Sequence, residues 1–249
     1  MRIAVIGGTG LIGTKVAEQL GAHGHDVVVA SRATGVNSYT TEGLAEALDG
    51  VEVVVDTSNS SYLDAAAAME FFYASTLNLL TFGRAAGVRH HVALSVVGTD
   101  RLAASEGGYF AAKAAQEKLI VEAGLPYSIV HATQFFEFVR SIGDAATGAG
   151  QVRLSNAYIQ PMAADDVARA VARTAVGTPV NGLVEFAGPE RFRLDDLVRH
   201  ELKARNDPRE VVADPLATYF GADLSETELL PASTATLSTT TFWDWLGAR

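Results

Sequence analysis

The chain opens with Met1-Arg2-Ile3-Ala4-Val5-Ile6-Gly7-Gly8-Thr9-Gly10-Leu11-Ile12-Gly13, an apolar run that leads directly into closely spaced glycines. A strand of buried-type residues that ends in glycines and is followed by a helical pattern is typical of the first βα unit of a dinucleotide-binding fold. One glycine permits the tight turn, one leaves room for a pyrophosphate, and one lets the helix pack close to the sheet. The unpaired N–H groups at the start of that helix would then face the phosphates.

Two registers of the glycines are compatible with this motif. Gly7, Gly10 and Gly13 give one spacing, whereas Gly8, Gly10 and Gly13 give the other. Because Ile6 ends the apolar run, the first register places a glycine at the turn itself, and we favour it. The alternative is a turn with a purely structural role. The residues of this loop expected to bind a cofactor are Gly7, Thr9, Gly10, Leu11, Ile12 and Gly13.

Strand-like and helix-like segments alternate along the first half of the chain. Near-continuous apolar runs are typical of parallel strands that helices cover on both faces. Further strands are expected at 27–31, 51–56, 91–95 and 127–131, and helices at 10–22, 41–49, 64–86 and 107–124. Repeated βα alternation predicts an α/β fold, a Rossmann-type doubly wound parallel sheet with right-handed crossovers.

The alternation becomes less regular after residue 132. We expect a small, flexible stretch at 143–150, a short strand segment at 154–162, a helix at 164–174, a strand at 183–186 and a helix at 194–204. Residues 1–132 are therefore predicted to form an NAD(P)-binding Rossmann core, and 133–249 a smaller substrate-facing lobe interleaved with it. The alternative is that these are late elements of one compact domain.

Composition restricts the class of partner. The chain has 249 residues, a formal net charge of −10 and no cysteine, which excludes disulfides and thiol chemistry. Nucleic acids and anionic membranes are not expected partners, because both require clustered basic residues. No apolar run is long enough to cross a bilayer, no signal segment precedes the first strand, and no metal-ligand spacing is present. We expect a soluble, cytoplasmic protein that binds a small-molecule substrate, and we leave a homo-oligomer open.

The residues after the second strand bear on which dinucleotide binds. An NAD site usually has Asp or Glu there, whereas an NADP site has Arg. Ser31 and Arg32 occupy this position, and no acidic residue comes before Glu42, so NADP is favoured over NAD. After the third strand, residues expected to line the adenine or ribose side are Asp56, Thr57, Ser58 and Asn59. The alternative for Asp56 is that it only caps the turn.

A candidate catalytic set follows the fourth strand. Ser95 ends that strand, where ligands bind in open α/β sheets, and Tyr109 and Lys113 lie four residues apart on one face of a predicted helix. A nearby ammonium favours phenolate, so we expect Lys113 to lower the pKa of Tyr109 and make it an acid/base group. Lys113 is also expected to bind the nicotinamide ribose, and Ser95 to hold the substrate carbonyl. The alternative is a chance spacing on an amphipathic helix.

Taken with these motifs, the chain resembles an atypical short-chain dehydrogenase/reductase of the NmrA-like NAD(P)-binding family over most of its length. The resemblance rests on the glycine loop, Ser31-Arg32, and the segments 94–98, 109–113, 126–136, 161–168 and 186–190. It implies a Rossmann core, a small C-terminal lobe and NAD(P) at the glycine loop. Many reductases of this superfamily use a Ser-Tyr-Lys triad, which Ser95, Tyr109 and Lys113 match. Some members of the NmrA-like branch only bind the dinucleotide as redox sensors.

The segment after the fifth strand departs from the superfamily pattern. It reads His131-Ala132-Thr133-Gln134-Phe135-Phe136, without the Pro-Gly pair that is common beside the nicotinamide. His131 is interpreted as a packed residue rather than a base, and Ala132 and Thr133 are expected to contact the cofactor. The predicted substrate pocket consists of Val96, Val97, Tyr109, Gln134, Phe135, Phe136 and Phe138, which favours an apolar or aromatic substrate. The alternative is that these phenylalanines belong only to the core.

The sequence therefore predicts an NAD(P)-dependent oxidoreductase that transfers hydride to or from a carbonyl, a quinone or a conjugated aromatic, polyketide-like molecule. One alternative is an NmrA-like redox-sensing regulator with little catalysis. Another is a tailoring enzyme of secondary metabolism that performs oxygenation, epimerisation or dehydration on the same fold.

Overall fold

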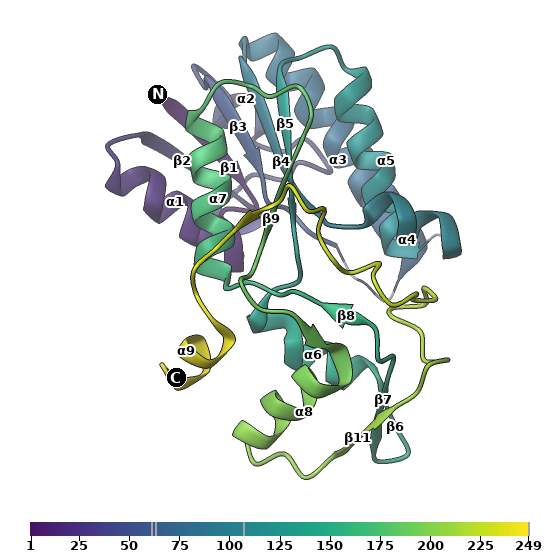
Figure 1. The fold of residues 1–249 in the computed structure, drawn as a ribbon. Helices are drawn as coiled ribbons and strands as arrows, with labels where there is room; N and C mark the ends of the chain where they lie inside the picture. The colour runs from purple at the N-terminus through teal and green to yellow at the C-terminus, as the bar shows by residue number, and fades with distance from the viewer. Residues whose placement is uncertain (61, 63, 107, 249) are drawn as a thin grey trace.

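A central parallel sheet organises the computed structural model, which describes residues 1–60, 62, 64–106 and 108–248 (Figure 1). Within these ranges seven strands pair in the order β2-β1-β3-β4-β5-β9-β12, and every neighbouring pair is parallel. The strands are β1 (Arg2–Ile6), β2 (Asp26–Ala30), β3 (Val53–Asp56), β4 (His90–Val96), β5 (Tyr127–Ala132), β9 (Leu183–Ala187) and β12 (Thr236–Leu237). The predicted α/β, doubly wound fold is confirmed. Because β2 and β3 flank β1 on opposite sides, the strand order reverses there, and a crevice opens at the carboxyl ends.

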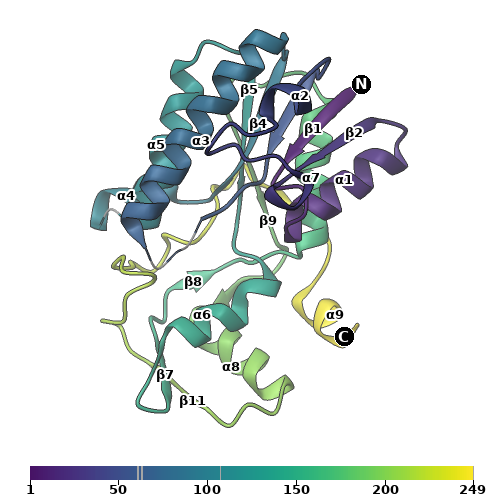
Figure 2. The same ribbon diagram turned by 180° about the vertical axis from the view of Figure 1, so that it is seen from behind.

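Helices cover both faces of this sheet. Helices α1 and α7 pack together on one face, and α3 and α5 lie together on the other (Figures 1 and 2). The helices of these layers and their flanking segments are α1 (Leu11–Ala22), the 3₁₀ turn η1 (Arg32–Thr34), α2 (Leu44–Ala47), α3 (Ala65–Ala86), α4 (Thr99–Glu106), α5 (Gly108–Glu122) and α7 (Ala164–Val176).

The apolar runs of the strands explain this layering. In β1, Ile3 and Val5 pack in the cluster under α1 and α7, whereas Ala4 and Ile6 pack in the cluster with Leu79 of α3. Successive residues of a strand point to opposite faces, so a strand that is apolar at every position must be covered on both sides. Burying each large aliphatic side chain contributes about 1.5–3 kcal/mol to folding.

The second half of the chain contributes to two regions. Strands β9 and β12 extend the central sheet, and α7 covers it, whereas the remaining elements lie beyond the carboxyl ends of the strands (Figure 1). These elements are η2 (Phe136–Phe138), α6 (Val139–Ala145), β6 (Thr147–Gly148), β7 (Gln151–Leu154), β8 (Tyr158–Ile159), β10 (Phe192–Arg193), α8 (Leu194–Ala204), β11 (Glu210–Ala213) and α9 (Phe242–Gly247). They share with α3, α4 and α5 a core that includes Phe136 and Phe242 as well as Phe72 and Tyr109.

Several predicted boundaries are wrong. The stretch 143–150, expected to be flexible, contains the end of α6 and the turn between the antiparallel strands β6 and β7. The helix expected at 107–124 is α5, preceded by the unpredicted α4, and residue 107 itself lies outside the described residues. The helix expected at 41–49 is confined to α2, and the segment 154–162 contains the two-residue strand β8. The helix 194–204 is confirmed as α8.

Candidate functional site

A large pocket lies at the carboxyl edge of the sheet, where the strand order reverses. Its volume is about 960 Å³, and it runs from the glycine loop to a group of aromatic rings. Most residues predicted for the site line it: Gly7, Thr9, Gly10, Leu11, Ile12, Ser31, Arg32, Thr57, Ser58, Asn59, Ser95, Val96, Tyr109, Lys113, Ala132, Thr133, Gln134, Phe135 and Phe138. The fold therefore brings the glycine loop and the Tyr109/Lys113 pair into one cavity.

Two residues predicted to bind the cofactor lie outside the lining. A Cβ atom on Gly13 would approach the Gly7 carbonyl oxygen to 2.2 Å, so the absence of a side chain at Gly13 allows α1 to pack against the loop. Asp56 is 1% exposed, and its carboxylate accepts hydrogen bonds from the backbone and hydroxyl of Ser58 and from Gln116. Its role is thus structural at the turn after β3, the alternative that the sequence left open.

Two residues predicted for the substrate pocket are also outside it. Val97 is fully buried behind the end of β4. Phe136 is fully buried and packs against Phe242 and Trp245, with ring centroids at 5.5 and 5.3 Å. The 3₁₀ turn η2 explains this, because consecutive residues of a tight turn point in different directions. Phe136 therefore belongs to the core, as the alternative interpretation held, whereas Phe138 faces the cavity.

The glycine loop fits the pyrophosphate of a dinucleotide. Gly7 has φ +74°, and a Cβ there would lie 2.9 Å from the Ser58 backbone, so the turn off β1 requires glycine. Helix α1 starts at Leu11 with Gly10 at its N-cap and without a side-chain cap. Its first N–H groups are therefore available to an anion in the cavity. These features favour the first register of the motif.

The segment after β2 forms one wall of the cavity. Arg32 is exposed in η1 and lines the pocket beside Ser31. The sequence did not identify the next part of this wall, which includes Asn37, Ser38 and Tyr39. Ser38 is buried and is fixed by α3, because its hydroxyl bonds to Ser75 at 2.7 Å. This segment lacks a regular pattern, so no local signal marked it.

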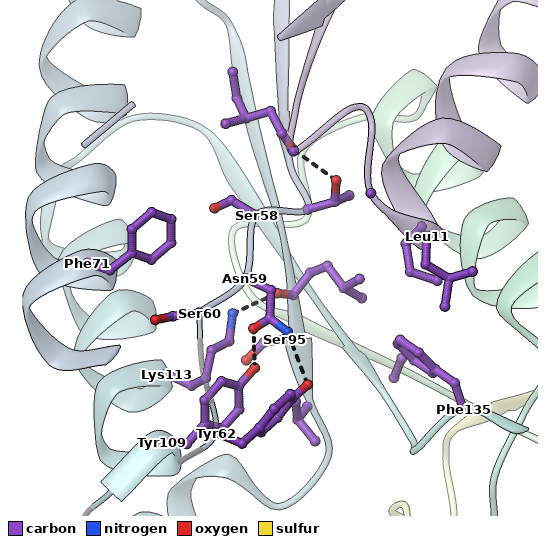
Figure 3. A pocket seen from close by; sticks show the side chains of 18 of the residues that line it. Leu11, Ser58, Asn59, Ser60, Tyr62, Phe71, Ser95, Tyr109, Lys113 and Phe135 are labelled. Carbon is purple, nitrogen blue, oxygen red and sulfur yellow. Dashed lines mark hydrogen bonds between the residues drawn. The ribbon is translucent and has the colours of Figure 1, made fainter. Parts of the chain in front are cut away.

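Tyr109 is a buried phenol at the centre of the pocket. It is 4% exposed, and its hydroxyl donates to Asn59 Oδ1 at 2.8 Å, while Asn59 Nδ2 donates to the Tyr62 hydroxyl at 3.1 Å (Figure 3). Burial, with a smaller contribution from Tyr62, raises the pKa of Tyr109 well above 10. This direction is opposite to the lowering expected from the sequence. The phenol therefore carries its proton at neutral pH.

Lys113 lies one turn further along α5 and is 2% exposed. Its ammonium donates to the Leu94 carbonyl oxygen at 2.9 Å and to the Gln116 side chain, whose amide donates to Asp56 at 2.9 Å. Burial lowers the pKa of Lys113 to about 8, against the nearby carboxylates of Asp56 and Glu117, which raise it. A buried ammonium needs such partners, and Gln116 links it to a buried carboxylate.

Ser95 reaches the pocket wall, but its hydroxyl donates away from the cavity to Glu117. Glu117 also bonds to His131 Nε2 at 2.9 Å, and His131 Nδ1 lies 3.9 Å from Glu185. His131 is thus packed and paired, as interpreted from the sequence. A hydroxyl that donates to Glu117 offers a ligand only its acceptor lone pairs.

Aromatic side chains that the sequence did not identify complete the far end of the pocket. Tyr62 packs on Tyr109, Phe138 and Phe220, with ring centroids at 4.2, 5.0 and 5.3 Å. Tyr219 precedes Phe220 in an irregular segment more than 80 residues after Phe138 in the chain. No spacing rule connects such distant residues, so only the folded chain shows that they share a cavity.

The described residues also bear on two other kinds of site. Within the part of the chain that the structure describes, no helix combines the length and apolar character needed to span a bilayer. In the same residues, no group of three or more His, Asp or Glu side chains is arranged to hold a metal ion.

A protein-family comparison matches most of the core. The model described as the NAD dependent epimerase/dehydratase family matches residues 3–158. Among curated proteins, the photosystem II assembly factor Ycf39 of Synechocystis is 25% identical over 151 residues, which are 55% of this chain. The match spans 46% of that relative's length, so less than half of it is represented.

Solved structures share the fold over nearly the whole chain. The Bordetella bronchiseptica enzyme WbmH, solved with NAD⁺, has a TM-score of 0.72 at 15% identity and covers 100% of this chain and 96% of its own. For QOR2, an NADPH-dependent quinone oxidoreductase of Escherichia coli, the TM-score is 0.66 at 19% identity. That comparison covers 99% of this chain and 98% of QOR2. At these identities the similarity concerns the fold. Both neighbours bind or use a nicotinamide dinucleotide.

Proposed function

Because this chain belongs to the NAD-dependent epimerase/dehydratase family of NAD(P)-binding proteins, we propose that it is an NAD(P)-dependent oxidoreductase. It transfers hydride between the nicotinamide and a carbonyl, a quinone or another conjugated small molecule. The membership agrees with the resemblance to atypical short-chain dehydrogenases/reductases. The observation that carries the proposal is the single cavity lined by both the glycine loop and the Tyr109 hydroxyl.

The residues present fit a nicotinamide dinucleotide. The loop at Gly7 and the uncapped N-terminus of α1 would hold the pyrophosphate, and Thr133 offers a fully buried hydroxyl without a hydrogen-bond partner among the described residues. Arg32 and Ser31 would hold the adenosine ribose, and a 2′-phosphate there would pair with the guanidinium. This arrangement favours NADP. When bound, the cofactor supplies or accepts hydride at its nicotinamide ring.

Tyr109 is the proposed general acid. Its raised pKa keeps the phenol protonated, which suits proton donation to a substrate oxygen and hence the direction of reduction. The carbonyl carbon gains the hydride, the C=O double bond becomes single, and the oxygen takes the Tyr109 proton to give an alcohol. Water then returns a proton to the phenolate. We assign the electrostatic stabilisation of that phenolate to the Lys113 ammonium, which lies one turn along α5 from Tyr109.

Two other activities remain as alternatives on the same fold. The description of the matching family favours epimerisation, in which hydride is removed from a substrate and returned to its other face. An epimerase would interconvert two isomers without net consumption of NADPH. The redox-sensing regulator would bind the dinucleotide and oxidise none.

The test is NADPH oxidation with a panel of quinones and aldehydes, followed by the loss of NADPH absorbance. Tyr109→Phe should lower turnover by ~10²- to 10⁴-fold, which is the usual effect of removing a positioned acid. Tyr73→Phe is the matched control, because Tyr73 is 51% exposed on α3 and does not line the pocket. Undiminished turnover in Tyr109→Phe would contradict the proposal.

A further inference from the structure

Gln134 is a buried side chain in the pocket wall with unsatisfied polar atoms. It is 6% exposed, and neither its amide oxygen nor its amide nitrogen has a hydrogen-bond partner among the described residues. Its main chain is fixed, because its carbonyl oxygen accepts from the Met162 N–H at 2.9 Å. Leaving a buried amide unpaired is unfavourable, so an amide kept in a pocket wall indicates a ligand that completes its hydrogen bonds.

Tyr219 is the neighbouring phenol on this side of the pocket. It is 4% exposed, and burial raises the pKa of its hydroxyl. The Gln134 side chain opposes this rise, so it lies near the Tyr219 hydroxyl, although the two groups do not reach hydrogen-bond geometry. A tight turn positions it, since Tyr219 and Ala222 exchange backbone hydrogen bonds of 2.8 and 3.0 Å. Phe220 and Gly221 occupy the turn with φ +50° and +89°. A phenylalanine in this region of φ is strained, and the hydrogen bonds of the turn hold it in place.

The charges of the pocket restrict what can bind beside Gln134. Among the described lining residues, the charged side chains are Arg32, Lys113 and Glu137. Arg32 lies at the adenosine end, and Glu137 accepts from the Ala164 N–H at 3.0 Å and from Trp245 Nε1 at 2.9 Å. Lys113 donates to Leu94 and Gln116. A phosphate or carboxylate at the aromatic end would therefore lose its hydration without gaining a cation of its own.

The aromatic rings indicate the shape of the ligand. Phe138 and Phe220 stack with their centroids 5.7 Å apart, and Phe110 and Tyr219 stack at 6.3 Å. Flat rings at these spacings favour a planar partner, which can take offset-stacked or edge-to-face positions against them.

We propose that the Gln134 amide binds a second oxygen of the substrate, remote from the oxygen that Tyr109 protonates. The substrate class is then an uncharged, planar carbonyl compound with an additional carbonyl or hydroxyl group. This inference rests on the proposed function, because it assigns the first oxygen to Tyr109. It disfavours nucleoside diphosphate sugars, because the charged residues of the described lining leave no uncommitted cation at this end for their diphosphate.

The test measures binding rather than turnover. Calorimetric titrations of the NADP⁺ complex compare 1,4-naphthoquinone with 1-tetralone, which keeps one carbonyl and lacks the second oxygen. The chain contains no cysteine, so the quinone has no thiol to alkylate. Gln134→Met preserves the length of the side chain and removes both amide atoms. It should weaken naphthoquinone binding about 10-fold and leave tetralone binding unchanged, which is the effect of one buried hydrogen bond.

The melting temperature is a second readout. The control is Gln151→Met, the same type of substitution on β7, outside the pocket. Since the Gln134 amide is unpaired, Gln134→Met should keep or raise the melting temperature. Selective loss of naphthoquinone affinity supports the inference even if no turnover is detected. Absence of turnover would contradict only the proposed oxidoreductase function. The inference is overturned by equal losses for both ligands, by weaker NADP⁺ binding, by a lower melting temperature, or by wild-type protein that does not bind naphthoquinone.

Discussion

The Ser95 hydroxyl donates its hydrogen bond to Glu117, which is one turn beyond Lys113 on α5. In this arrangement Ser95 can accept from a ligand but has no proton to offer a substrate carbonyl. The sequence assigned that donation to Ser95. We assign it to Tyr109, whose hydroxyl donates to the neutral amide oxygen of Asn59 inside the pocket, a weaker acceptor than the Glu117 carboxylate and one that a substrate oxygen can replace.

Ser95→Ala should therefore affect turnover much less than Tyr109→Phe. We expect a loss of less than ~10-fold in kcat, against ~10²- to 10⁴-fold for the phenol. The reason is that the alanine removes one acceptor and leaves Glu117 paired with His131. Steady-state kinetics of the two variants decide the point, and equal losses would restore Ser95 to the role of donor.

The turnover of carbonyl reduction should fall as the pH rises through about 8. Burial lowers the pKa of Lys113 to about 8, so the ammonium that stabilises the Tyr109 phenolate is lost above this pH. A pH–kcat profile measures the midpoint. Lys118→Met, at an exposed site on the same helix, should not move it, whereas Lys113→Arg should shift the fall to higher pH in any activity that it retains. A profile that is flat across this range contradicts the assignment.

The same group links stability to pH. The pKa of Lys113 is about 8 in the folded protein and 10.5 for an unperturbed lysine in the unfolded chain, so between these values the unfolded chain binds the extra proton. The contribution of Lys113 to the free energy of unfolding therefore rises with pH across this window. Denaturant titrations at pH 8 and 10 should show a smaller rise for Lys113→Met than for the wild type, and an identical rise would show that Lys113 is not the group responsible.

Arg32→Ala should change cofactor preference. If the guanidinium pairs with a 2′-phosphate, NADPH should bind ~10- to 100-fold more weakly, whereas NADH, which lacks this phosphate, should change little. Fluorescence titration of both cofactors gives the ratio. Arg84→Ala on α3, away from the pocket, is the control. Equal weakening of NADPH and NADH would mean that Arg32 does not discriminate between them.

Gly13→Ala should disrupt the cofactor loop. The new Cβ would meet the Gly7 carbonyl oxygen at 2.2 Å, so either the turn or α1 must shift. We expect a lower melting temperature and loss of dinucleotide binding. Gly21→Ala in the same helix is the matched control, because its Cβ meets nothing within 4 Å and should add about 0.5–1 kcal/mol of stability. Normal cofactor affinity in Gly13→Ala would show that the loop tolerates a shift of the helix.

The sequence predicted those parts of the molecule that local patterns encode. The glycine turn and the spacing of Tyr109 and Lys113 are local, and both lie in the pocket. The predicted direction of the Tyr109 pKa shift was wrong. The spacing of Tyr109 and Lys113 places an ammonium on the same helix face, but it does not show how completely the phenol is desolvated. Phe136 was misplaced because pattern alone does not show which residue of a 3₁₀ turn faces inward. Tyr62 and Phe220 were missed since their neighbours come from distant segments.

Glu137 joins the wall of the pocket to the last helix of the chain, since its carboxylate accepts from Trp245 Nε1 in α9. Replacing the Trp245 indole by phenylalanine would thus withdraw one donor from a carboxylate in the cavity, although the indole itself lines no part of it. The last helix is in this way a remote support of the pocket wall.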